Sequence, residues 1–447
     1  MPVPRNALAS RRENGLDQKK RPDPMRVIVI GAGIVGVCTA YWLNRHGMQV
    51  TVVDRRSGVA QESSFGNAGI LAADYAAPWA APGMPARVLA HLFKSEAPVA
   101  LRASLDPALW KWLVKWLGQC RAERHAANKR TMQRVARYSR AQLAALREEY
   151  GFEYERRIGY LQLLRTQRDV DATLATRQIL QESGIAHQLL SPEEATAMDV
   201  HLQDAVHVGT PLAGAIHYPD DESGNCPLFA RLLAAECERR GVEFVFNTVA
   251  QPVQNAGGIV AGVRLQDGRT LSAQAVVVAS GSDAGEWLGR LGVRVPVYPV
   301  RGYVANLPLR NDVIGPRRAF VDETYRVTVT PLGQRLRVAG TAELGWRGPA
   351  LRDKALRTLV KAAQDWMPGM LDFSRATWWA GTRPMTPDGP PVLGATRLPG
   401  LYLNVGHGSQ GWSMAAGTGR IVADLVAGRT PEIELDGLDI GRYARKN

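Results

Sequence analysis

Two hydrophobic periodicities alternate along the chain and predict strands and helices in turn. Short continuous apolar runs are typical of buried strands, and apolar residues spaced by three and four positions are typical of helices that bury one face. The predicted strands are 26–30, 50–53, 159–164, 243–246, 258–265, 275–279, 296–307, 326–331, 335–341 and 401–405. The predicted helices follow residue 33 up to His46 and then cover 107–120, 125–150, 170–182, 226–240, 352–366 and 413–427. A further helix is predicted to begin after Ser191, because serine is a favoured N-cap and Pro192 a favoured first helical residue.

The order of these elements predicts an α/β fold in which two domains interleave. A Rossmann-type nucleotide-binding domain is expected to take up residues 25–85, 196–295 and 395–447. The antiparallel strands around the turn at Gly333 predict a discontinuous α+β domain, built on an antiparallel sheet from residues 86–195 and 296–394. Each domain is therefore expected to be made of segments that are distant in the sequence.

Composition and charge narrow the class of protein. The chain has 447 residues, 45% of them hydrophobic, without an apolar run long enough to cross a bilayer. Residues 1–24 are polar and basic without an apolar signal region, and they are expected to form a disordered leader. The net charge of +13 favours anionic surroundings but looks dispersed. Four cysteines without metal-ligand spacing predict reduced thiols, no metal and a cytoplasmic location.

The most informative motif is a strand, glycine turn, helix and second strand that ends at Asp54. In such a unit the first glycine, Gly31, allows the tight turn, and Gly33 lets a pyrophosphate approach the backbone. The third glycine, Gly36, allows close packing of helix and strand. The helix N-terminus favours phosphate, and Asp54 stands where a carboxylate can bind a ribose hydroxyl pair. This segment predicts an adenine dinucleotide site.

A second G-x-G-x-x-G pattern runs from Gly406 to Gly411, also between a strand and a helix. No strand ending in an acid follows it, so we reject a second nucleotide there. The helix N-terminus would instead favour negative charge on a reduced flavin ring by up to about 2 kcal/mol. This feature suits FAD better than NAD.

Six motifs together resemble the bacterial D-amino acid dehydrogenase family, within the superfamily of D-amino acid oxidase and glycine oxidase. They are the glycine turn at Gly31 and the segments 62–69 (ESSFGNAG), 77–83 (APWAAPG), 299–303 (PVRGY), 381–389 (GTRPMTPDG) and 404–412 (NVGHGSQGW). The resemblance covers residues 25–443. It implies that FAD is the cofactor, and that the two predicted domains bind FAD and substrate respectively.

The resemblance also implies which residues face the cofactor. The glycine turn and Asp54 would hold its nucleotide part, residues 64–69 would lie near the isoalloxazine ring, and the 406–411 loop would lie at its pyrimidine edge. The candidate cofactor-binding residues are Gly31, Gly33, Ile34, Val35, Gly36, Asp54, Arg55, Ser63, Ser64, Asn67, Ala68, Gly69, Val249, Ala279, Gly281, His407, Gly408, Ser409, Gln410 and Gly411.

On the substrate side the resemblance points to Arg383, the arginine of the family's G-x-R-P motif. A guanidinium can bind a carboxylate through two charge-assisted hydrogen bonds, although an arginine there could also form a structural salt bridge. Tyr303 and Tyr325 are candidate pocket residues, weighed against ordinary packing. His407 could bind the flavin, transfer a proton or shape its loop, and hydride transfer needs no base.

The implied reaction is oxidative deamination of a D-amino acid by hydride transfer from Cα to flavin N5, giving a 2-oxo acid and ammonia. Electrons would pass to a quinone or another respiratory-chain acceptor. Ile70 and Ala72 to Asp74 depart from the family's pattern, so a D-hydroxyproline or other secondary-amine dehydrogenase is the alternative. An RNA-modifying flavoprotein is a third hypothesis, but no RNA module is found and no nucleic-acid partner is expected.

One helix raises the question of membrane contact. Within 107–120, a helical wheel places Lys111 and Lys115 on one side and an apolar face on the other, formed by Leu109, Trp112, Leu113, Trp116 and Leu117. Tryptophan and lysine suit a membrane interface, which would place the protein peripherally on the inner face of the plasma membrane. Packing of this helix on its own domain is the alternative.

Overall fold

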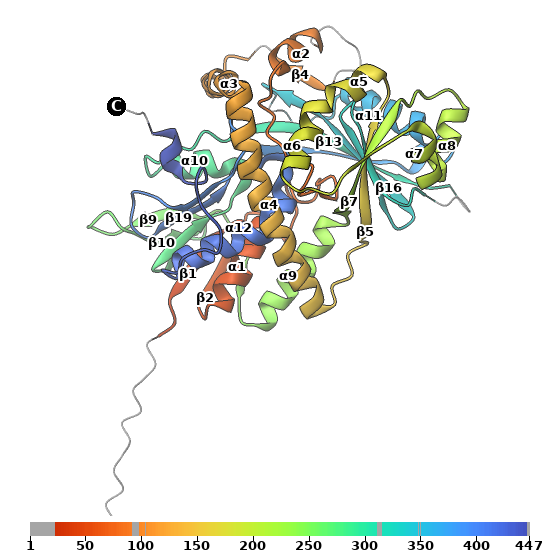
Figure 1. Cartoon of the computed structure of the whole chain (residues 1–447). Helices are drawn as coiled ribbons and strands as arrows, with labels where there is room; N and C mark the ends of the chain where they lie inside the picture. Colours follow the sequence, from red (N-terminus) through yellow and green to blue (C-terminus); the bar gives the residue numbers. More distant parts are fainter. Residues whose placement is uncertain are drawn as a thin grey trace, which may run out of the picture.

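The chain folds around two separate β-sheets in a computed structural model that describes residues 23–91, 98–102, 104–310, 315–346, 348 and 350–444 (Figure 1). Most of the expected leader, residues 1–22, lies outside the described residues. Within the described ranges, no helix is both long and apolar enough to cross a membrane. In the same ranges, no group of three or more histidine, cysteine or acidic side chains is placed to hold a metal ion.

The first sheet has six strands in the order β18-β19-β12-β1-β2-β8, and all but β18 run parallel. Its strands are β1 (Arg26–Ile30), β2 (Gln49–Val53), β8 (Glu243–Val245), β12 (Ala275–Val278), β18 (Val392–Ala395) and β19 (Leu401–Val405). Strands β1 and β12 are buried almost throughout, which explains why they read as continuous apolar runs. The predicted Rossmann-type sheet is confirmed.

Helices cover this sheet and pack closely on one another. They are α1 (Ile34–Arg45), α9 (Cys226–Arg239) and α12 (Gly411–Val426), which share one hydrophobic core with β1 and β2. Helix α1 approaches α12 at Gly419, where a Cβ atom would lie 2.8 Å from the backbone of Cys38. Helix α4 (Ala122–Tyr150) packs on α12 and runs along the face shown in Figure 1.

The second sheet has ten strands, eight of them in the order β17-β13-β16-β15-β14-β5-β7-β3. The strands are β3 (Ile70–Leu71), β4 (Val99–Leu101), β5 (Arg157–Leu164), β6 (Gln188–Leu190), β7 (Gly214–Ser223), β13 (Tyr298–Pro308), β14 (Ala319–Asp322), β15 (Val327–Leu332), β16 (Arg335–Leu344) and β17 (Thr377–Met385). Pairing is antiparallel except between β14 and β5 and between β16 and β4. One face packs on helix α11 (Asp353–Trp366). The predicted antiparallel sheet is therefore confirmed as a mostly antiparallel, mixed sheet.

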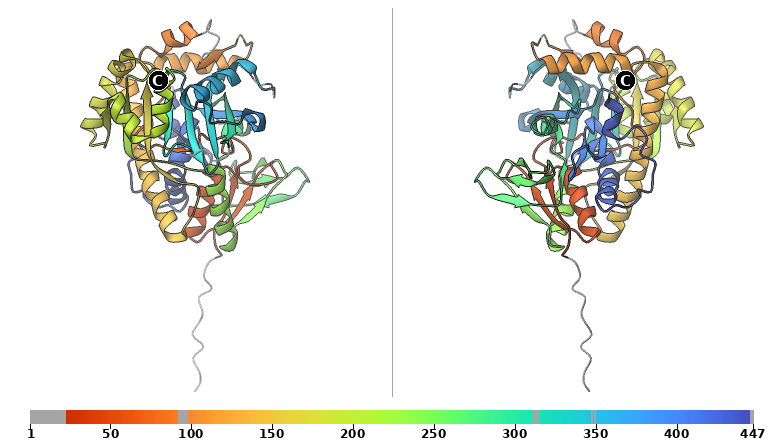
Figure 2. Two further views of the ribbon diagram at one scale, coloured as in Figure 1. Left: turned by 90° about the vertical axis from the view of Figure 1, so that its right-hand side faces the viewer. Right: turned by 90° about the vertical axis from the view of Figure 1, so that its left-hand side faces the viewer.

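The remaining elements are short helices, 3-10 turns and a third, smaller sheet. The further helices are α2 (Met84–His91), α3 (Pro107–Gln119), α5 (Gln167–Ala172), α6 (Leu174–Glu182), α7 (Pro192–Met198), α8 (Val200–His207), α10 (Ala284–Gly289) and the 3-10 turns η1 (Gly281–Asp283), η2 (Phe373–Arg375), η3 (Gly408–Gln410) and η4 (Ile440–Tyr443). A small antiparallel sheet, β9 (Gln251–Gln254), β10 (Val260–Arg264) and β11 (Thr270–Ser272), projects from the body in both views of Figure 2.

Strand pairing moves the predicted domain boundaries. Strand β7 lies within 196–295 but pairs with β5 in the large sheet. The short strand β3 lies within 25–85, and it pairs with β7 in the same large sheet. Strand β18 lies within 296–394 but pairs with β19 in the parallel sheet. The two domains therefore exchange strands near residues 70, 214 and 392, which brings the loops around these crossings to the domain boundary.

Candidate active site

The N-terminus of α1 forms a glycine-lined cradle at the end of β1. Gly31 has a φ of 110°, and a Cβ atom there would lie 2.6 Å from the carbonyl oxygen of Ala279. A Cβ atom on Gly36 would overlap the carbonyl oxygen of Gly31. The N-cap residue of α1 is Gly33, which has no side chain to cap the helix, and among the described residues the hydroxyl of Ser280, next to Gly31, is buried without a hydrogen-bond partner. A helix N-terminus that begins at such a glycine suits a bound phosphate.

Asp54 closes this cradle from the end of β2. Its carboxylate accepts hydrogen bonds from the backbone N–H of Ala32 at 2.6 Å and of Arg56 at 2.8 Å. The exposed Val249 adjoins Thr248, whose N–H donates to the Asp54 carbonyl. The structure thus brings Asp54 and Val249 to the same edge of the sheet as the glycine turn.

The guanidinium of Arg55 is already paired with two carboxylates of the protein. Its guanidinium pairs with Glu62 at 2.9 Å and with Asp283 at 2.8 Å. These ion pairs join the loop after β2, which holds both Arg55 and Glu62, to the segment after β12, which holds Ala279, Gly281 and Asp283. Arg55 therefore positions the walls of the predicted cofactor site, and a direct contact with FAD stays a prediction.

The loop 63–69 connects the two domains by binding to three strands of the large sheet. Its serine Ser63 donates its hydroxyl to the carbonyl of Thr382 on β17 at 2.6 Å. From β16, Arg337 donates to the carbonyl of Asn67 at 3.0 Å, and from β15, Thr330 donates to that of Ala68 at 2.7 Å. These bonds hold the predicted isoalloxazine loop against the face of the sheet that carries Arg383.

The same loop also reaches the glycine cradle. The hydroxyl of Ser64 accepts a hydrogen bond from the backbone N–H of Ile34, in the first turn of α1, at 3.0 Å. Gly69 has a φ of 82° and lies so close to Gly224 that a Cβ atom would be 2.7 Å from its carbonyl oxygen. One loop therefore links the phosphate-type helix end to the substrate-side sheet.

Arg383 lies on β17 with its guanidinium over the backbone of Gly302 on the neighbouring strand β13. Its Nη1 donates to the carbonyl of Thr341 at 2.8 Å, and its Nη2 faces the carbonyl of Gly340 at 3.4 Å. A Cβ atom on Gly302 would lie 2.6 Å from Nη2, so only glycine leaves room for this side chain. Among the described residues, no carboxylate forms an ion pair with Arg383. Burial lowers its pKa to about 10, which still leaves it charged at neutral pH.

A β-bulge shapes the backbone that Arg383 contacts. Arg301 pairs with Glu343 and Tyr303 with Gly340, so Gly302 alone stands opposite two residues, Thr341 and Ala342. Thr341 adopts a φ of 51°, a left-handed conformation that is rare for a β-branched residue. Such bulges often redirect groups at functional sites, and here the bulge turns two carbonyls toward the guanidinium.

An aromatic wall that the sequence analysis did not identify stands beside Arg383. The Trp379 ring lies directly against Gly66 of the loop 63–69 and against Gly381 of its own strand, and neither glycine has room for a Cβ atom. The partly exposed Phe65 contacts Trp379 with ring centroids 5.9 Å apart. The glycines of the quoted motifs were the only signal in the sequence that a large ring packs here.

The loop 406–411 contacts the carboxyl end of β17 at Met385, the last residue of the strand that carries Arg383. His407 forms a β-bridge with Met385, and a Cβ atom on Gly408 would lie 2.8 Å from the Met385 sulfur. Helix α12 begins at Gly411 without a side-chain cap. Its dipole therefore points into the same region as the 63–69 loop, as the prediction of a flavin-facing loop requires.

His407 is buried and lies against Thr418 of α12. Its Nε2 and the Thr418 hydroxyl are 3.1 Å apart. Burial lowers the histidine pKa to about 3, so the ring stays neutral at physiological pH. A general base works best with a pKa near the operating pH. Of the three roles considered for His407, the structure therefore favours shaping the loop.

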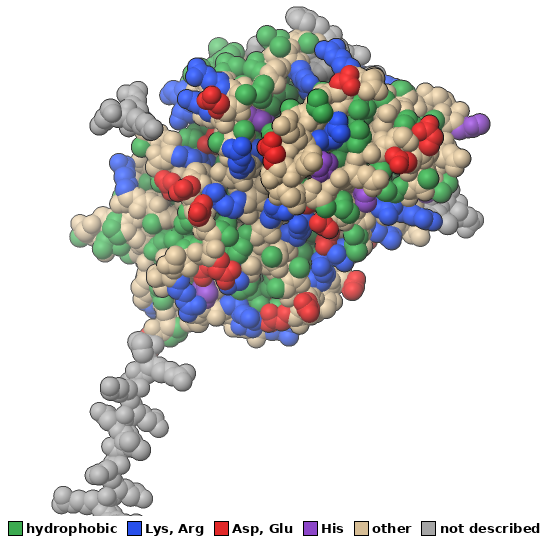
Figure 3. All heavy atoms as spheres, viewed as in Figure 1, with side chains coloured by type: hydrophobic (Ala, Val, Ile, Leu, Met, Phe, Trp, Pro, Cys, Tyr) green, Lys and Arg blue, Asp and Glu red, His purple; other side chains and the backbone are tan. Residues whose placement is uncertain are grey.

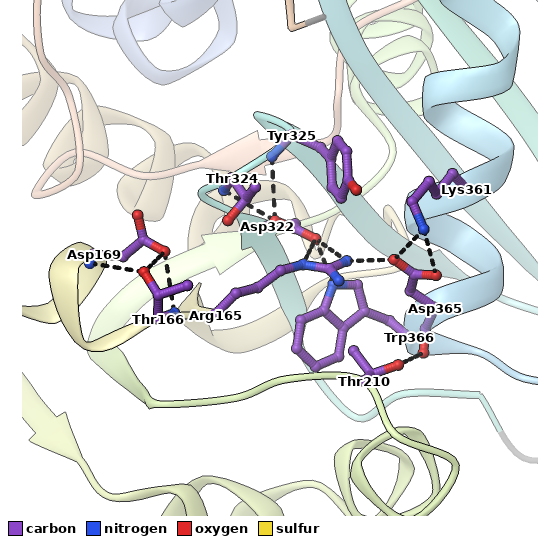
Figure 4. A network of polar contacts seen from close by, with 10 residues as sticks. All are labelled: Arg165, Thr166, Asp169, Thr210, Asp322, Thr324, Tyr325, Lys361, Asp365 and Trp366. Carbon is purple, nitrogen blue, oxygen red and sulfur yellow. Dashed lines mark hydrogen bonds and ion pairs between the residues drawn. The ribbon is translucent and has the colours of Figure 1, made fainter. Parts of the chain in front are cut away.

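Tyr303 and Tyr325 do not lie with Arg383. Tyr303 is fully buried in the core under α11, on the opposite face of β13 from Gly302, with its hydroxyl bound to Glu343. Tyr325 lies over Arg165 with its ring centroid 4.9 Å from the guanidinium carbon, in the polar network of Figure 4. Tyr303 faces away from Gly302 because successive residues of a strand point to opposite faces of the sheet. The structure brings neither tyrosine to Arg383, and their assignment to the substrate pocket stays a prediction.

The helix proposed for membrane contact packs on its own domain. Leu109, Trp112 and Trp116 of α3 are buried together with Tyr298 and Met385, and the Trp112 indole N–H donates to the Met385 carbonyl at 2.9 Å. This contradicts a membrane role for these two tryptophans. Lysine and arginine are interspersed with acidic side chains on the face seen in Figure 3, without a continuous basic patch there.

The stretch that departs from the family pattern forms a charged cluster at the junction of α4 and β7. Asp74 is buried and pairs with Arg140 at 2.7 Å, and its backbone N–H donates to Asp221 at 3.2 Å. Burial and the neighbouring Asp74 carboxylate raise the pKa of Asp221 to about 8. The next residue, Tyr75, contacts Glu323 through its hydroxyl at 3.4 Å.

These features fit one flavin dinucleotide between the N-termini of α1 and α12, where neither N-cap residue forms a side-chain cap. The strands that lead into α1 and α12 are separated only by β12, about 10 Å across the sheet. The glycine cradle and the orphaned Ser280 hydroxyl suit the phosphates, while the loops 63–69 and 406–411 border the cationic Arg383 site. The arrangement can hold an anionic substrate next to a redox ring.

Comparisons with known proteins agree with this geometry. The model of the family described as FAD dependent oxidoreductase (DAO) matches residues 26–425. Proteins named D-amino acid dehydrogenase from Granulibacter bethesdensis and Methylobacterium radiotolerans are 42% and 43% identical over 421 residues, covering 94% of this chain and 100% of each relative. The solved structure of glycine oxidase from Geobacillus kaustophilus shares the fold, with a TM-score of 0.73, 22% identity, and coverage of 94% of this chain and 99% of that one. L-proline dehydrogenase from P. horikoshii also shares it, with a TM-score of 0.67, 20% identity, and coverage of 92% and 95%.

Proposed function

The chain belongs to the DAO family of FAD-dependent oxidoreductases, and from that premise we propose that it is a D-amino acid dehydrogenase that deaminates its substrate oxidatively. The observation that carries the proposal is Arg383, a cation without an ion-pair partner among the described residues, beside the loops 63–69 and 406–411. The two relatives named D-amino acid dehydrogenase match this chain over 94% of its length.

Arg383 binds the carboxylate of the amino acid. The carbonyls of Gly340 and Thr341 fix one side of its guanidinium, so the remaining N–H groups can form two parallel bonds to a carboxylate. The missing side chain of Gly302 makes the room that this guanidinium occupies. This fixed fork positions the substrate Cα, and such positioning accounts for much of the rate of a transfer reaction.

The residues at the phosphate cradle and in the two loops would hold FAD. When bound, FAD supplies the acceptor for the hydride that leaves the substrate Cα. The product imine is hydrolysed by water to a 2-oxo acid and ammonia. His407 takes no proton at neutral pH because its pKa is about 3, so the substrate must arrive with a neutral amine. The rate should then rise with pH as the substrate ammonium loses its proton.

The electron acceptor is proposed to be a quinone or another respiratory-chain carrier in preference to O2. The support is that the matched relatives are named dehydrogenases. Oxygen consumption and reduction of a quinone analogue, measured side by side with D-alanine, distinguish the two. Oxygen uptake at the rate of quinone reduction would contradict this part of the proposal.

The test of the function is anaerobic bleaching of the flavin absorbance in the purified holoprotein. D-alanine should bleach it and L-alanine should not, and ammonia should appear in proportion to the flavin reduced. Bleaching by cyclic secondary amines alone, without ammonia, would favour the secondary-amine dehydrogenase. Bleaching by L-isomers alone would refute the stereochemical assignment.

A further inference from the structure

Thr341 combines two features that a structural residue in a strand does not need. It is 5% exposed, and its hydroxyl oxygen is buried without a hydrogen-bond partner among the described residues. An unsatisfied buried hydroxyl is costly, and in a native protein it calls for an explanation such as a ligand. The residue also adopts a φ of 51°, where a β-branched side chain is strained.

A glycine would serve the bulge better if only the backbone mattered. The bulge places two residues, Thr341 and Ala342, opposite the single residue Gly302, and bulge positions with positive φ are usually glycine. The chain does have a glycine one residue earlier, at Gly340. Retaining threonine in the strained position therefore points to a use for its side chain.

The location of Thr341 indicates what that use is. Its carbonyl accepts the 2.8 Å hydrogen bond from Nη1 of Arg383, so the free hydroxyl belongs to a residue in direct contact with the unpaired guanidinium. Opposite the bulge lies Gly302, whose missing side chain makes the space that the guanidinium fills. A cation on β17 and an unused hydroxyl donor on β16 thus lie on the two strands that flank β13, and the bond from Nη1 to the Thr341 carbonyl joins their residues.

We propose that Thr341 is a second substrate-binding residue, whose hydroxyl donates a hydrogen bond to the carboxylate held by Arg383. This inference rests on the proposed function and deepens it, because it assigns a specificity-determining contact at the same site. The strained backbone of Thr341 then has a purpose, since it directs the carbonyl to the arginine and leaves the hydroxyl for the ligand.

The test uses three variants of the holoprotein and the binding of propionate, a carboxylate without an amine, followed by the change in flavin absorbance. Thr341→Val keeps the branched shape and removes the hydroxyl, and it should raise the Kd of propionate about tenfold or more. Thr341→Ser keeps the hydroxyl and should stay within about threefold of the wild type. Thr341→Gly relieves the strain, so its thermal midpoint should equal or exceed that of the wild type while it binds propionate as weakly as the valine variant.

Several outcomes would overturn the inference. A valine variant that binds as the wild type does, a serine variant that loses as much affinity as valine, or a wild type that does not bind propionate would each do so. A glycine variant that is clearly destabilised would show that the side chain serves packing. Failure of the proposed function is seen separately, as a wild-type flavin that binds propionate but is not bleached by any D-amino acid.

Discussion

Two arginines of the same sheet, the buried Arg165 and the partly buried Arg383, have opposite surroundings. Arg165 pairs with Asp322 at 2.6 Å and with Asp365 at 2.8 Å, and it stacks on two aromatic rings (Figure 4). Burial opposes its charge, but the hydrogen bonds and attraction of Asp322 and Asp365 outweigh it and raise its pKa. Arg383 contacts two carbonyls and burial lowers its pKa.

The partners of an arginine indicate whether it is structural or binds a ligand. A buried charge needs compensation, and Arg165 receives it within the protein. The guanidinium of Arg383 receives only partial compensation from backbone dipoles, so its remaining donors are available to an anion from outside. Arg165 is therefore a structural residue and Arg383 a binding residue, although both lie on strands or strand ends of one sheet.

The largest expected effect comes from replacing the binding arginine, Arg383. Arg383→Met should lower kcat/KM for D-alanine about 1,000-fold, because a charge-assisted contact of this kind contributes about 4 kcal/mol. Its thermal midpoint should stay close to that of the wild type, since no internal carboxylate loses a partner. Steady-state kinetics and thermal unfolding measure the two effects. A large loss of stability would show that Arg383 is a structural residue, as Arg165 is.

The matched variant at the structural arginine should give the reverse pattern. Arg165→Met leaves Asp322 buried with only the Trp366 indole and backbone donors, and should destabilise the protein by about 3 kcal/mol. Denaturant unfolding measures this cost. The folded fraction, counted by its flavin content, should keep the wild-type kcat/KM. Unchanged stability would show that the ion-pair network of Figure 4 contributes little.

A smaller effect is expected from filling the space under the binding arginine. Gly302→Ala places a methyl group against the guanidinium and should displace it, lowering kcat/KM about tenfold to hundredfold. The effect should appear mainly in KM for carboxylate substrates. Gly369→Ala is not a suitable control because its φ is 72°, whereas Gly289→Ala has open space around it and should change nothing. Equal activity of both variants would contradict the described position of Arg383.

The smallest effect is a pH dependence that only the binding arginine should show. The protonated guanidinium binds the anion, and its pKa is about 10, so the affinity for propionate is fully present below pH 9 and is lost as pH rises through 10. The Kd should then rise about tenfold per pH unit. A pH-independent Kd up to pH 11, with the protein still folded, would contradict a lowered pKa.

Much of the fold could be predicted because its signals are local. The glycine turn at Gly31, the buried run of β1 and the acid at Asp54 define the parallel sheet within one stretch of sequence. Strand β7 was missed because its sequence, GAIHYPDDES, is polar, and its buried acids are compensated by arginines of α4, which is distant in the sequence. Such compensation leaves no pattern in the strand itself.

The candidate site was predicted only in part, for a geometric reason. Arg383 was found through its motif. The side of the sheet on which Tyr303 lies depends on how β13 pairs with β17, and this pairing between distant segments leaves no local pattern in the sequence. Trp379 was missed because an aromatic residue in a strand usually belongs to the hydrophobic core. Only the glycines at 66 and 381, which leave no room for a Cβ atom, show where its ring lies.

Carboxylate binding by Arg383 is tested best with two substrates, one of which lacks the carboxylate. The rate of anaerobic flavin reduction is measured with D-alanine and with D-alaninamide, for the wild type and for Arg383→Met. If Arg383 binds the carboxylate, the wild type strongly prefers D-alanine, and the variant loses this preference while its rate with the amide stays within about threefold of the wild type. An equal loss of rate with both substrates would show that Arg383 does not act by binding the carboxylate.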